Sequence, residues 1–121
     1  GDFFEATVLT GVAADALLTR EETFGPVAGI VKFDTEAQAI DYANRGQAGL
    51  AAYLYTRDAD RMTRVSEALE YGMVGINTGL ISTEVGPFGG WRESGLGREG
   101  SRHGLEEYLE MKFLVRQVAS A

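Results

Sequence analysis

Short strand-like and helix-like segments alternate along the chain, and this alternation limits the possible folds more than any other feature. Apolar, β-branched and aromatic residues predict strands over residues 3–10, 29–33, 50–56, 73–77 and 112–118. Helices are predicted over residues 13–20 and after Thr35, Asp58 and Ser101. Strands that alternate with helices of this length indicate βαβ crossovers. The predicted fold class is therefore α/β, with a mainly parallel sheet and flanking helices.

Two of the predicted helices have clear start signals. Thr35 is followed three residues later by Gln38, which is the pattern of a capping box. Asp58 can cap the next helix, with Asp60 in its first turn, where negative charge favours the helix dipole. Gly72 is the predicted C-terminal stop of that helix.

Composition excludes several classes of function. The net charge of −7 argues against a nucleic-acid partner, because phosphate binding needs clustered Lys and Arg. No apolar run approaches the roughly 20 residues that span a bilayer, and the acidic N-terminus does not resemble a signal peptide. The absence of cysteine excludes disulfides, thiolate metal sites and a cysteine nucleophile. We expect a soluble, cytoplasmic protein with no membrane partner.

Glycine is unusually frequent, with 16 of 121 residues, and it clusters near the C-terminus at Gly79 and from Gly86 to Gly104. Such a cluster indicates a loop with demanding backbone geometry, often close to a ligand. Residues 95–100 match G-x-G-x-x-G, but no strand precedes them directly. They therefore do not fit a dinucleotide-binding turn, and a tight loop before a helix is the better interpretation.

The segment from Glu21 to Pro26 has two interpretations. A carboxylate at Glu22 could accept hydrogen bonds from vicinal sugar hydroxyls, and the ring of Phe24 could pack on a planar group. The alternative is two surface acids before a core phenylalanine, and spacing alone favours that alternative. His103, the only histidine, has no visible partner and is given no role. No His, Asp and Glu spacing resembles a metal site.

Two motifs together resemble the aldehyde dehydrogenase superfamily. They are Glu22-Thr23-Phe24-Gly25-Pro26 and residues 87–99, which read PFGGWRESGLGRE. Residues 75–82 and 97–101 are most similar to the succinate-semialdehyde dehydrogenases. The resemblance covers essentially the whole chain. It implies the C-terminal part of an aldehyde dehydrogenase catalytic domain, over residues 1–111, and a terminal oligomerisation strand and tail, over residues 112–121.

The resemblance also implies a covalent chemistry. In this family a cysteine thiolate attacks the aldehyde, hydride passes to NAD or NADP, and a glutamate activates water to release the acid. Those two residues and the phosphate-binding turn lie earlier in family sequences than this chain begins. We therefore expect the chain alone to be inactive, to contain no catalytic residue and to bind no cofactor tightly.

Four positions are implied as site residues by the same resemblance. Glu22 corresponds to the glutamate that binds the nicotinamide ribose, and Phe24 to an aromatic residue on the nicotinamide side of the cofactor. Ser82 corresponds to a serine that binds the substrate carboxylate, and Phe88 to an aromatic residue of the substrate tunnel. Arg92 stands where family members vary and is given no site role.

The expected partners are the remainder of the dehydrogenase chain, a small aldehyde substrate and further copies joined through the terminal strand. The alternative is a free-standing, non-catalytic binding or oligomerisation module that retains this fold. A cysteine and a glycine-rich turn upstream in the same gene would favour the enzyme.

Overall fold

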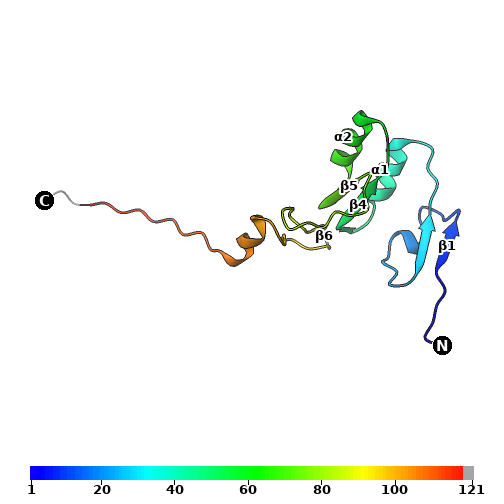
Figure 1. The fold of residues 1–121 in the computed structure, drawn as a ribbon, viewed down its shortest axis with the longest axis horizontal. Helices are drawn as coiled ribbons and strands as arrows, with labels where there is room; N and C mark the ends of the chain where they lie inside the picture. Colours follow the sequence, from blue (N-terminus) through cyan, green and yellow to red (C-terminus); the bar gives the residue numbers. More distant parts are fainter. Residues whose placement is uncertain (119–121) are drawn as a thin grey trace.

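The computed structural model describes residues 1–118, and its strands form three separate pairs (Figure 1). The two longer pairs are parallel, and the shortest is antiparallel. The pairs are β1 (Thr7–Thr10) with β2 (Val27–Ile30), β4 (Ala51–Leu54) with β5 (Met73–Ile76), and β3 (Ala48–Gly49) with β6 (Trp91–Arg92). The α/β class is confirmed, but the strands do not join into one sheet.

Helix α1 (Glu36–Asn44) begins where the sequence predicted. The Thr35 hydroxyl accepts a hydrogen bond from the Gln38 backbone N–H at 3.2 Å. The side-chain oxygen of Gln38 accepts in turn from the backbone N–H of Asp34 at 2.8 Å. Two of the unpaired N–H groups at the start of the helix region are thus satisfied.

Helix α2 (Ala59–Ala68) also begins as predicted, because the Asp58 carboxylate accepts from the Arg61 N–H at 3.0 Å. The predicted stop at Gly72 is wrong. The helix ends four residues earlier, and Leu69 closes it by donating its N–H to the Val65 carbonyl at 3.0 Å. Gly72 does not take a left-handed backbone conformation. The structure instead requires it to be small, because another backbone segment lies against it.

The predicted helix over residues 13–20 is also wrong, since only the single 3₁₀ turn η1 (Leu17–Thr19) forms there. The Thr19 hydroxyl donates to the carbonyls of Ala14 and Ala16 at 2.9 and 2.7 Å. A hydroxyl that bonds nearby backbone in this way favours a local turn over a continuing α-helix. Gly11, with φ +68°, closes β1 as predicted.

The last predicted helix is the 3₁₀ segment η2 (His103–Tyr108). The Ser101 hydroxyl accepts from the His103 N–H at 3.2 Å, but Arg102 occupies the N-cap position. Residues 109–118 then run extended, away from the rest of the chain and without a strand partner (Figure 1). A strand needs a neighbour to pair its backbone, so the strand predicted over 112–118 does not form in this single chain. Residues 119–121 of the predicted tail lie outside the described residues.

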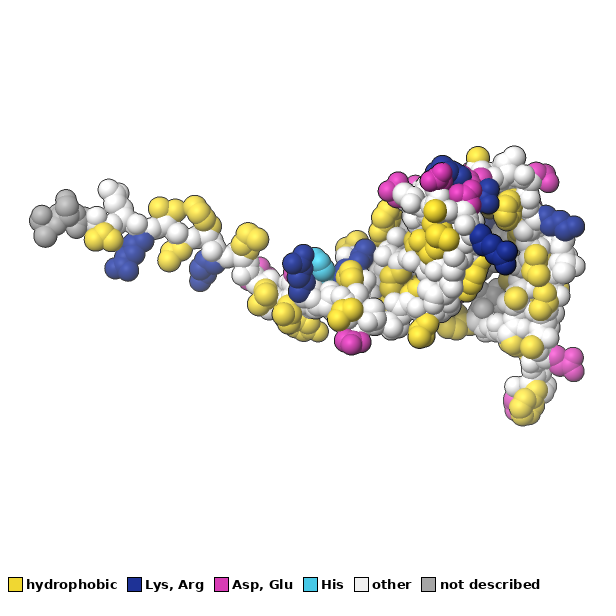
Figure 2. Space-filling view, turned by 45° about the horizontal axis from the view of Figure 1, so that its top comes forward, with side chains coloured by type: hydrophobic (Ala, Val, Ile, Leu, Met, Phe, Trp, Pro, Cys, Tyr) yellow, Lys and Arg dark blue, Asp and Glu magenta, His cyan; other side chains and the backbone are white. Residues whose placement is uncertain are grey.

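The packed core is small. Val65, in α2, and Leu69, which closes α2, are the buried hydrophobic side chains among the described residues, each 8% exposed. Large apolar side chains lie at the surface instead, notably along the N-terminal segment and the extended tail (Figure 2). Phe3 is 100% exposed and Met111 is 99% exposed. Within residues 1–118, no helix combines the length and apolar character that a bilayer crossing requires.

Candidate active site

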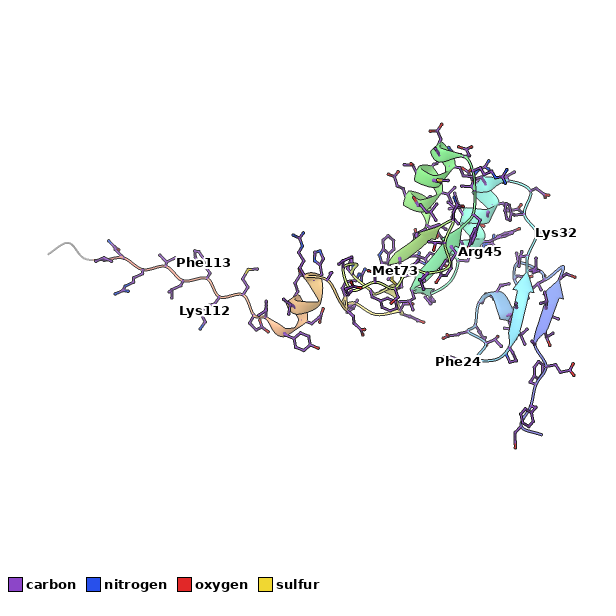
Figure 3. All side chains as sticks on the ribbon, viewed as in Figure 1. Phe24, Lys32, Arg45, Met73, Lys112 and Phe113 are labelled. Atoms are coloured by element: carbon purple, nitrogen blue, oxygen red, sulfur yellow. The ribbon has the colours of Figure 1, made fainter. Side chains whose placement is uncertain are left out.

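The Glu22–Phe24 segment lies in the turn that leads into β2 (Figure 3). The Gly25 N–H donates to the Thr23 carbonyl at 2.9 Å, and the Pro26 carbonyl accepts from Thr7 at the start of β1 at 2.8 Å. These bonds tie the turn to the β1–β2 pair. Glu22 is exposed, and the ring of Phe24 is 94% exposed. Phe24 is therefore not the core phenylalanine of the alternative interpretation.

Ser82 and Phe88 lie in the long loop that follows β5. Ser82 is exposed, whereas its neighbour Ile81 is half-buried over Gly75 in the strand. Phe88 is half-buried, and its backbone exchanges two hydrogen bonds with Glu99, of 2.8 and 2.7 Å. The loop thus folds back on itself and holds Phe88 at its inner turn.

Phe88 borders two cavities. The larger, of about 620 Å³, also contacts Leu50, Arg98 and Tyr108. The smaller, of about 310 Å³, lies between Phe88 and the residues of β5. A half-buried aromatic ring between two cavities is suited to line a passage for a small organic substrate.

Asn77 fixes the point at which this loop leaves β5. Its side-chain oxygen accepts from the Thr56 N–H at 2.9 Å, and its side-chain nitrogen donates to the Thr56 carbonyl at 2.8 Å. The two parallel strands β4 and β5 are therefore joined at their carboxyl ends. Ligands of open α/β sheets bind beyond this edge, and Ser82 follows it by five residues.

The middle of the loop lies directly against Gly72. A Cβ atom on Gly72 would lie 1.9 Å from the Gly89 carbonyl oxygen and 2.8 Å from the Gly90 Cα. No side chain fits in that space, so the contact is between backbone and backbone. Glycine at Gly89 is required as well, because a Cβ there would lie 2.5 Å from the Gly97 carbonyl.

Two arginines hold this loop, and neither was predicted from the sequence to have a role. Arg98 donates from Nη1 to the carbonyls of Gly90 and Gly97 at 2.9 and 2.8 Å. Arg98 therefore bonds within the loop, whereas Arg92 bonds outside it, donating to the carbonyls of Asn44 and Gly46 at the end of α1. The sequence signal that could have indicated these roles is the position of both arginines inside the glycine-rich stretch, where few other side chains can hold the backbone.

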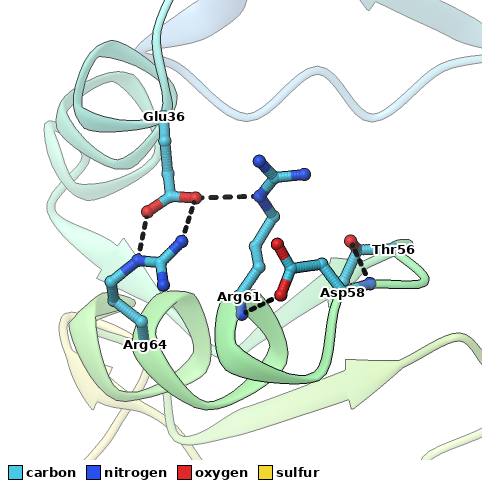
Figure 4. Close-up of polar contacts among 5 residues, drawn as sticks. All are labelled: Glu36, Thr56, Asp58, Arg61 and Arg64. Atoms are coloured by element: carbon cyan, nitrogen blue, oxygen red, sulfur yellow. Dashed lines mark hydrogen bonds and ion pairs between the residues drawn. The ribbon is translucent and has the colours of Figure 1, made fainter.

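A separate charged cluster joins α1 to α2 (Figure 4). Glu36 accepts two hydrogen bonds from Arg64, of 2.6 and 2.9 Å, and one from Arg61 of 2.9 Å. The hydrogen bonds from Arg64 and then Arg61 lower the pKa of Glu36 from 4.5 to about 2. The same contact raises the pKa of Arg64. The two arginines satisfy the carboxylate, so the cluster is a helix-to-helix link with no free acid or base.

Acidic and imidazole side chains do not assemble a metal site in residues 1–118. The imidazole of His103 lies 2.9 Å from Glu106, one turn further along η2, and both side chains are substantially exposed. The pair belongs to one short helix and faces no third ligand.

The structure places the four predicted site residues in two groups. Glu22 and Phe24 belong to the β1–β2 pair, and Ser82 and Phe88 belong to the loop after β5. No hydrogen bond or ion pair among residues 1–118 links the two groups. The two groups therefore belong to separate parts of the described fold.

Comparison with known proteins shows what this arrangement resembles. The sequence profile of the aldehyde dehydrogenase family matches residues 1–114. A glutarate-semialdehyde dehydrogenase of Pseudomonas putida is 59% identical over 118 residues, which cover 98% of this chain and 25% of the relative. The NADP(+) succinate-semialdehyde dehydrogenase of Escherichia coli strain K12 is 58% identical over 114 residues, or 94% of this chain and 24% of the relative.

Superposition of the backbone on solved structures also gives similarity to aldehyde dehydrogenases. The crystal structure of succinate-semialdehyde dehydrogenase from Burkholderia pseudomallei superposes with a TM-score of 0.84 at 61% identity. The superposed region covers 88% of this chain and 22% of that one. The chain therefore spans about a quarter of the length of the proteins it matches.

Proposed function

Because the chain belongs to the aldehyde dehydrogenase family, we propose that it is the C-terminal part of an NAD(P)-dependent enzyme that oxidises succinate semialdehyde to succinate. The observation that supports this most strongly is the family match over residues 1–114, which contain all four site residues. The thiolate, the general-base glutamate and the phosphate-binding turn would come from the rest of the protein. This chain contains no cysteine that could supply the thiolate.

The Glu22–Phe24 turn suits the nicotinamide end of the cofactor. The exposed carboxylate of Glu22 can accept hydrogen bonds from two ribose hydroxyls, which are donors. The ring of Phe24, almost fully exposed, can pack against a planar heterocycle. When bound, NAD(P) accepts the hydride from the substrate. The role of this chain is to hold the nicotinamide in position through the Glu22–Phe24 turn, which is hydrogen-bonded to β1.

The loop after β5 suits the substrate end. Ser82 offers a hydroxyl donor to a carboxylate, and Phe88 offers an apolar wall beside two cavities. Two of the relatives are named for aldehydes that carry a terminal carboxylate, succinate semialdehyde and glutarate semialdehyde. These aldehydes differ by one methylene, which a pocket discriminates by only about 1–3 kcal/mol. The proposed substrate class is therefore a short aldehyde with a distal carboxylate, and succinate semialdehyde is the proposed member.

The exposed apolar surface supports a larger protein over a free-standing module. Val8 and Leu9 of β1 are 64% and 44% exposed, and Phe113 and Leu114 of the tail are 89% and 80% exposed. Residues 1–111 would complete a catalytic domain with the rest of the chain. The C-terminal segment of residues 112–121 would pair with a neighbouring subunit, since its described part, residues 112–118, is extended and exposes unpaired backbone.

The test is to compare the complete gene product with the 121-residue chain. Both are purified and assayed for NADH and NADPH formation with succinate semialdehyde, with glutarate semialdehyde and with an uncharged aldehyde of similar length. We expect the complete protein to reduce the cofactor and to prefer the carboxylate-bearing aldehydes, and the chain alone to be inactive. A complete protein that oxidises none of the aldehydes, or that prefers the uncharged one, would contradict the proposal.

A further inference from the structure

Arg92 links three segments that are distant in the sequence. Its Nη1 donates to the carbonyl of Asn44, at the end of α1, at 3.0 Å and to the carbonyl of Gly46 at 2.6 Å. Its Nη2 forms an ion pair with Glu70, which follows α2. A cation at the carboxyl end of a helix is also favoured by the helix dipole. One side chain thus binds the glycine-rich loop to the ends of both helices.

The backbone at Arg92 has a conformation that is unfavourable for a residue with a long side chain. Its φ is +54°, in the left-handed region that a residue with a long side chain rarely adopts. Such a conformation persists only where the surroundings enforce it. Here the enforcing contacts are the pairing of Arg92 with Ala48 and the three polar contacts of the guanidinium.

The position of Phe88 depends on what holds the loop on either side. Gly89 and Gly90, which follow it, have no side chains to anchor them, and Gly89 lies in backbone contact with Gly72. Before this glycine pair, the bridge between Phe88 and Glu99 holds the loop to itself. After the pair, Arg92 holds the loop to α1. The same part of the loop is held by the Ser94 hydroxyl, which accepts from the Gly49 N–H, and by a backbone bond from Glu93 to Gln47. The guanidinium is the contact that extends from the loop to the ends of the two helices.

We infer that Arg92 is a positioning residue: through its contacts with Asn44, Gly46 and Glu70 it sets where Phe88 stands in the substrate passage, and so how well the enzyme selects its aldehyde. This inference rests on the proposed function. Arg92 does not touch the substrate. Its planar fork can serve two carbonyls and a carboxylate together, whereas the single ammonium group of lysine can serve fewer of them in the same geometry.

The test uses the complete enzyme with Arg92→Met, Arg92→Lys and the control Arg64→Met. Arg64 is also an arginine in an ion pair, but it joins α1 to α2 through Glu36 and has no hydrogen bond to the loop. KM and kcat are measured for succinate semialdehyde and for an uncharged aldehyde, and thermal melts are recorded for every variant.

For Arg92→Met we expect KM for succinate semialdehyde to rise roughly tenfold, with kcat changed by less than about threefold, because a displaced Phe88 weakens binding of the substrate and of the transition state alike. Arg92→Lys should give a smaller rise, and Arg64→Met should leave KM unchanged even if its melting temperature falls. A merely structural Arg92 would lower the melting temperature and leave KM for both aldehydes as in the unmodified enzyme, and that result would overturn the inference.

Three further outcomes have defined consequences. If Arg92→Met does not fold, Arg92→Lys decides alone, and an unchanged KM in that variant overturns the inference. If the unmodified complete protein oxidises no aldehyde, the proposed function fails. An active enzyme with an insensitive Arg92 contradicts the positioning role alone.

Discussion

The side-chain amide of Asn77 makes two hydrogen bonds to the backbone of Thr56, accepting from its N–H at 2.9 Å and donating to its carbonyl at 2.8 Å. Asn77 takes a left-handed backbone conformation, with φ +55°, and asparagine tolerates this better than most residues. The chain therefore turns sharply at the end of β5 while remaining fastened to the end of β4. The loop with Ser82 and Phe88 starts from this fixed point.

Two replacements of Asn77 separate the contribution of its hydrogen bonds from the contribution of its backbone strain. Asn77→Ala loses both hydrogen bonds and keeps the strained backbone, so it should lower the free energy of unfolding of the complete enzyme by about 1–3 kcal/mol. Asn77→Gly loses the same bonds without the strain and should be about 1 kcal/mol less destabilised than the alanine variant. Urea denaturation measures both values, and equal stability of the two variants would refute a contribution from backbone strain.

The contact between Gly72 and Gly89 should tolerate no side chain. A Cβ on Gly72 would lie 1.9 Å from a backbone oxygen, so either β5 or the loop must move. We expect Gly72→Ala to lower the free energy of unfolding by about 3 kcal/mol, the upper end of the usual cost of overpacking. Gly11→Ala is the matched control, because Gly11 has φ +68° with no atom within 4 Å of a Cβ and should lose only about 1 kcal/mol. Similar losses in both variants would contradict a steric requirement at Gly72.

The link between α1 and α2 should depend on pH through Glu36. The pKa of Glu36 is lowered from 4.5 to about 2 in the folded chain, mainly by hydrogen bonds from Arg64 and Arg61. A lowered folded-state pKa means that the stabilisation is complete above pH 4.5 and is lost as pH falls from there towards 2. Because the cluster is at the surface, the effect should be modest.

Glu36→Gln should therefore melt about 1–3 °C below the unmodified enzyme at pH 6–7. The difference should shrink as pH falls below 4.5, provided both proteins stay folded there. Asp41→Asn is the control, because Asp41 of α1 pairs with Arg45, the residue after the helix, and does not link the two helices. A melting difference that is constant from pH 7 to pH 3 would exclude the ionised carboxylate as its source.

Local signals in the sequence predicted the elements that depend on local bonds. The caps at Thr35 and Asp58 were predicted and are confirmed, because a hydroxyl or carboxylate reaches an N–H only three residues away. β5 was also predicted nearly to its ends. The helix predicted over residues 13–20 does not form, because the hydroxyl of Thr19 turns back to nearby carbonyls. The strand over 112–118 could not be confirmed in a single chain, since it needs a partner.

The arrangement of the candidate site could not be predicted from the sequence alone. The motifs indicated Glu22, Phe24, Ser82 and Phe88, and they remain predictions. Nothing local indicated that Arg92 reaches 46 and 48 residues back to Gly46 and Asn44, or that Gly72 touches Gly89. Long-range contacts of this kind arise from the tertiary arrangement.

Substrate selection should depend on the Ser82 hydroxyl. In the complete enzyme, Ser82→Ala removes a donor to the substrate carboxylate, and a hydrogen bond to a charged group is worth about 1.5–3 kcal/mol. KM for succinate semialdehyde should therefore rise by roughly 10- to 100-fold, whereas KM for an uncharged aldehyde should change little. Steady-state kinetics with the two substrates side by side provide the measurement. An equal rise for both would remove Ser82 from the carboxylate site.

The most direct measurement is single-turnover hydride transfer in the complete enzyme with Glu22→Gln, using the ordinary and the deuterated aldehyde. If Glu22 holds the nicotinamide ribose, loss of its charged acceptor should slow hydride transfer by up to about 10²-fold and reveal a deuterium isotope effect, while the melting temperature stays unchanged. Because Glu22 is exposed in the turn before β2, its replacement should not disturb the fold. An unchanged hydride-transfer rate, with or without a lower melting temperature, would contradict a cofactor-binding role for this segment.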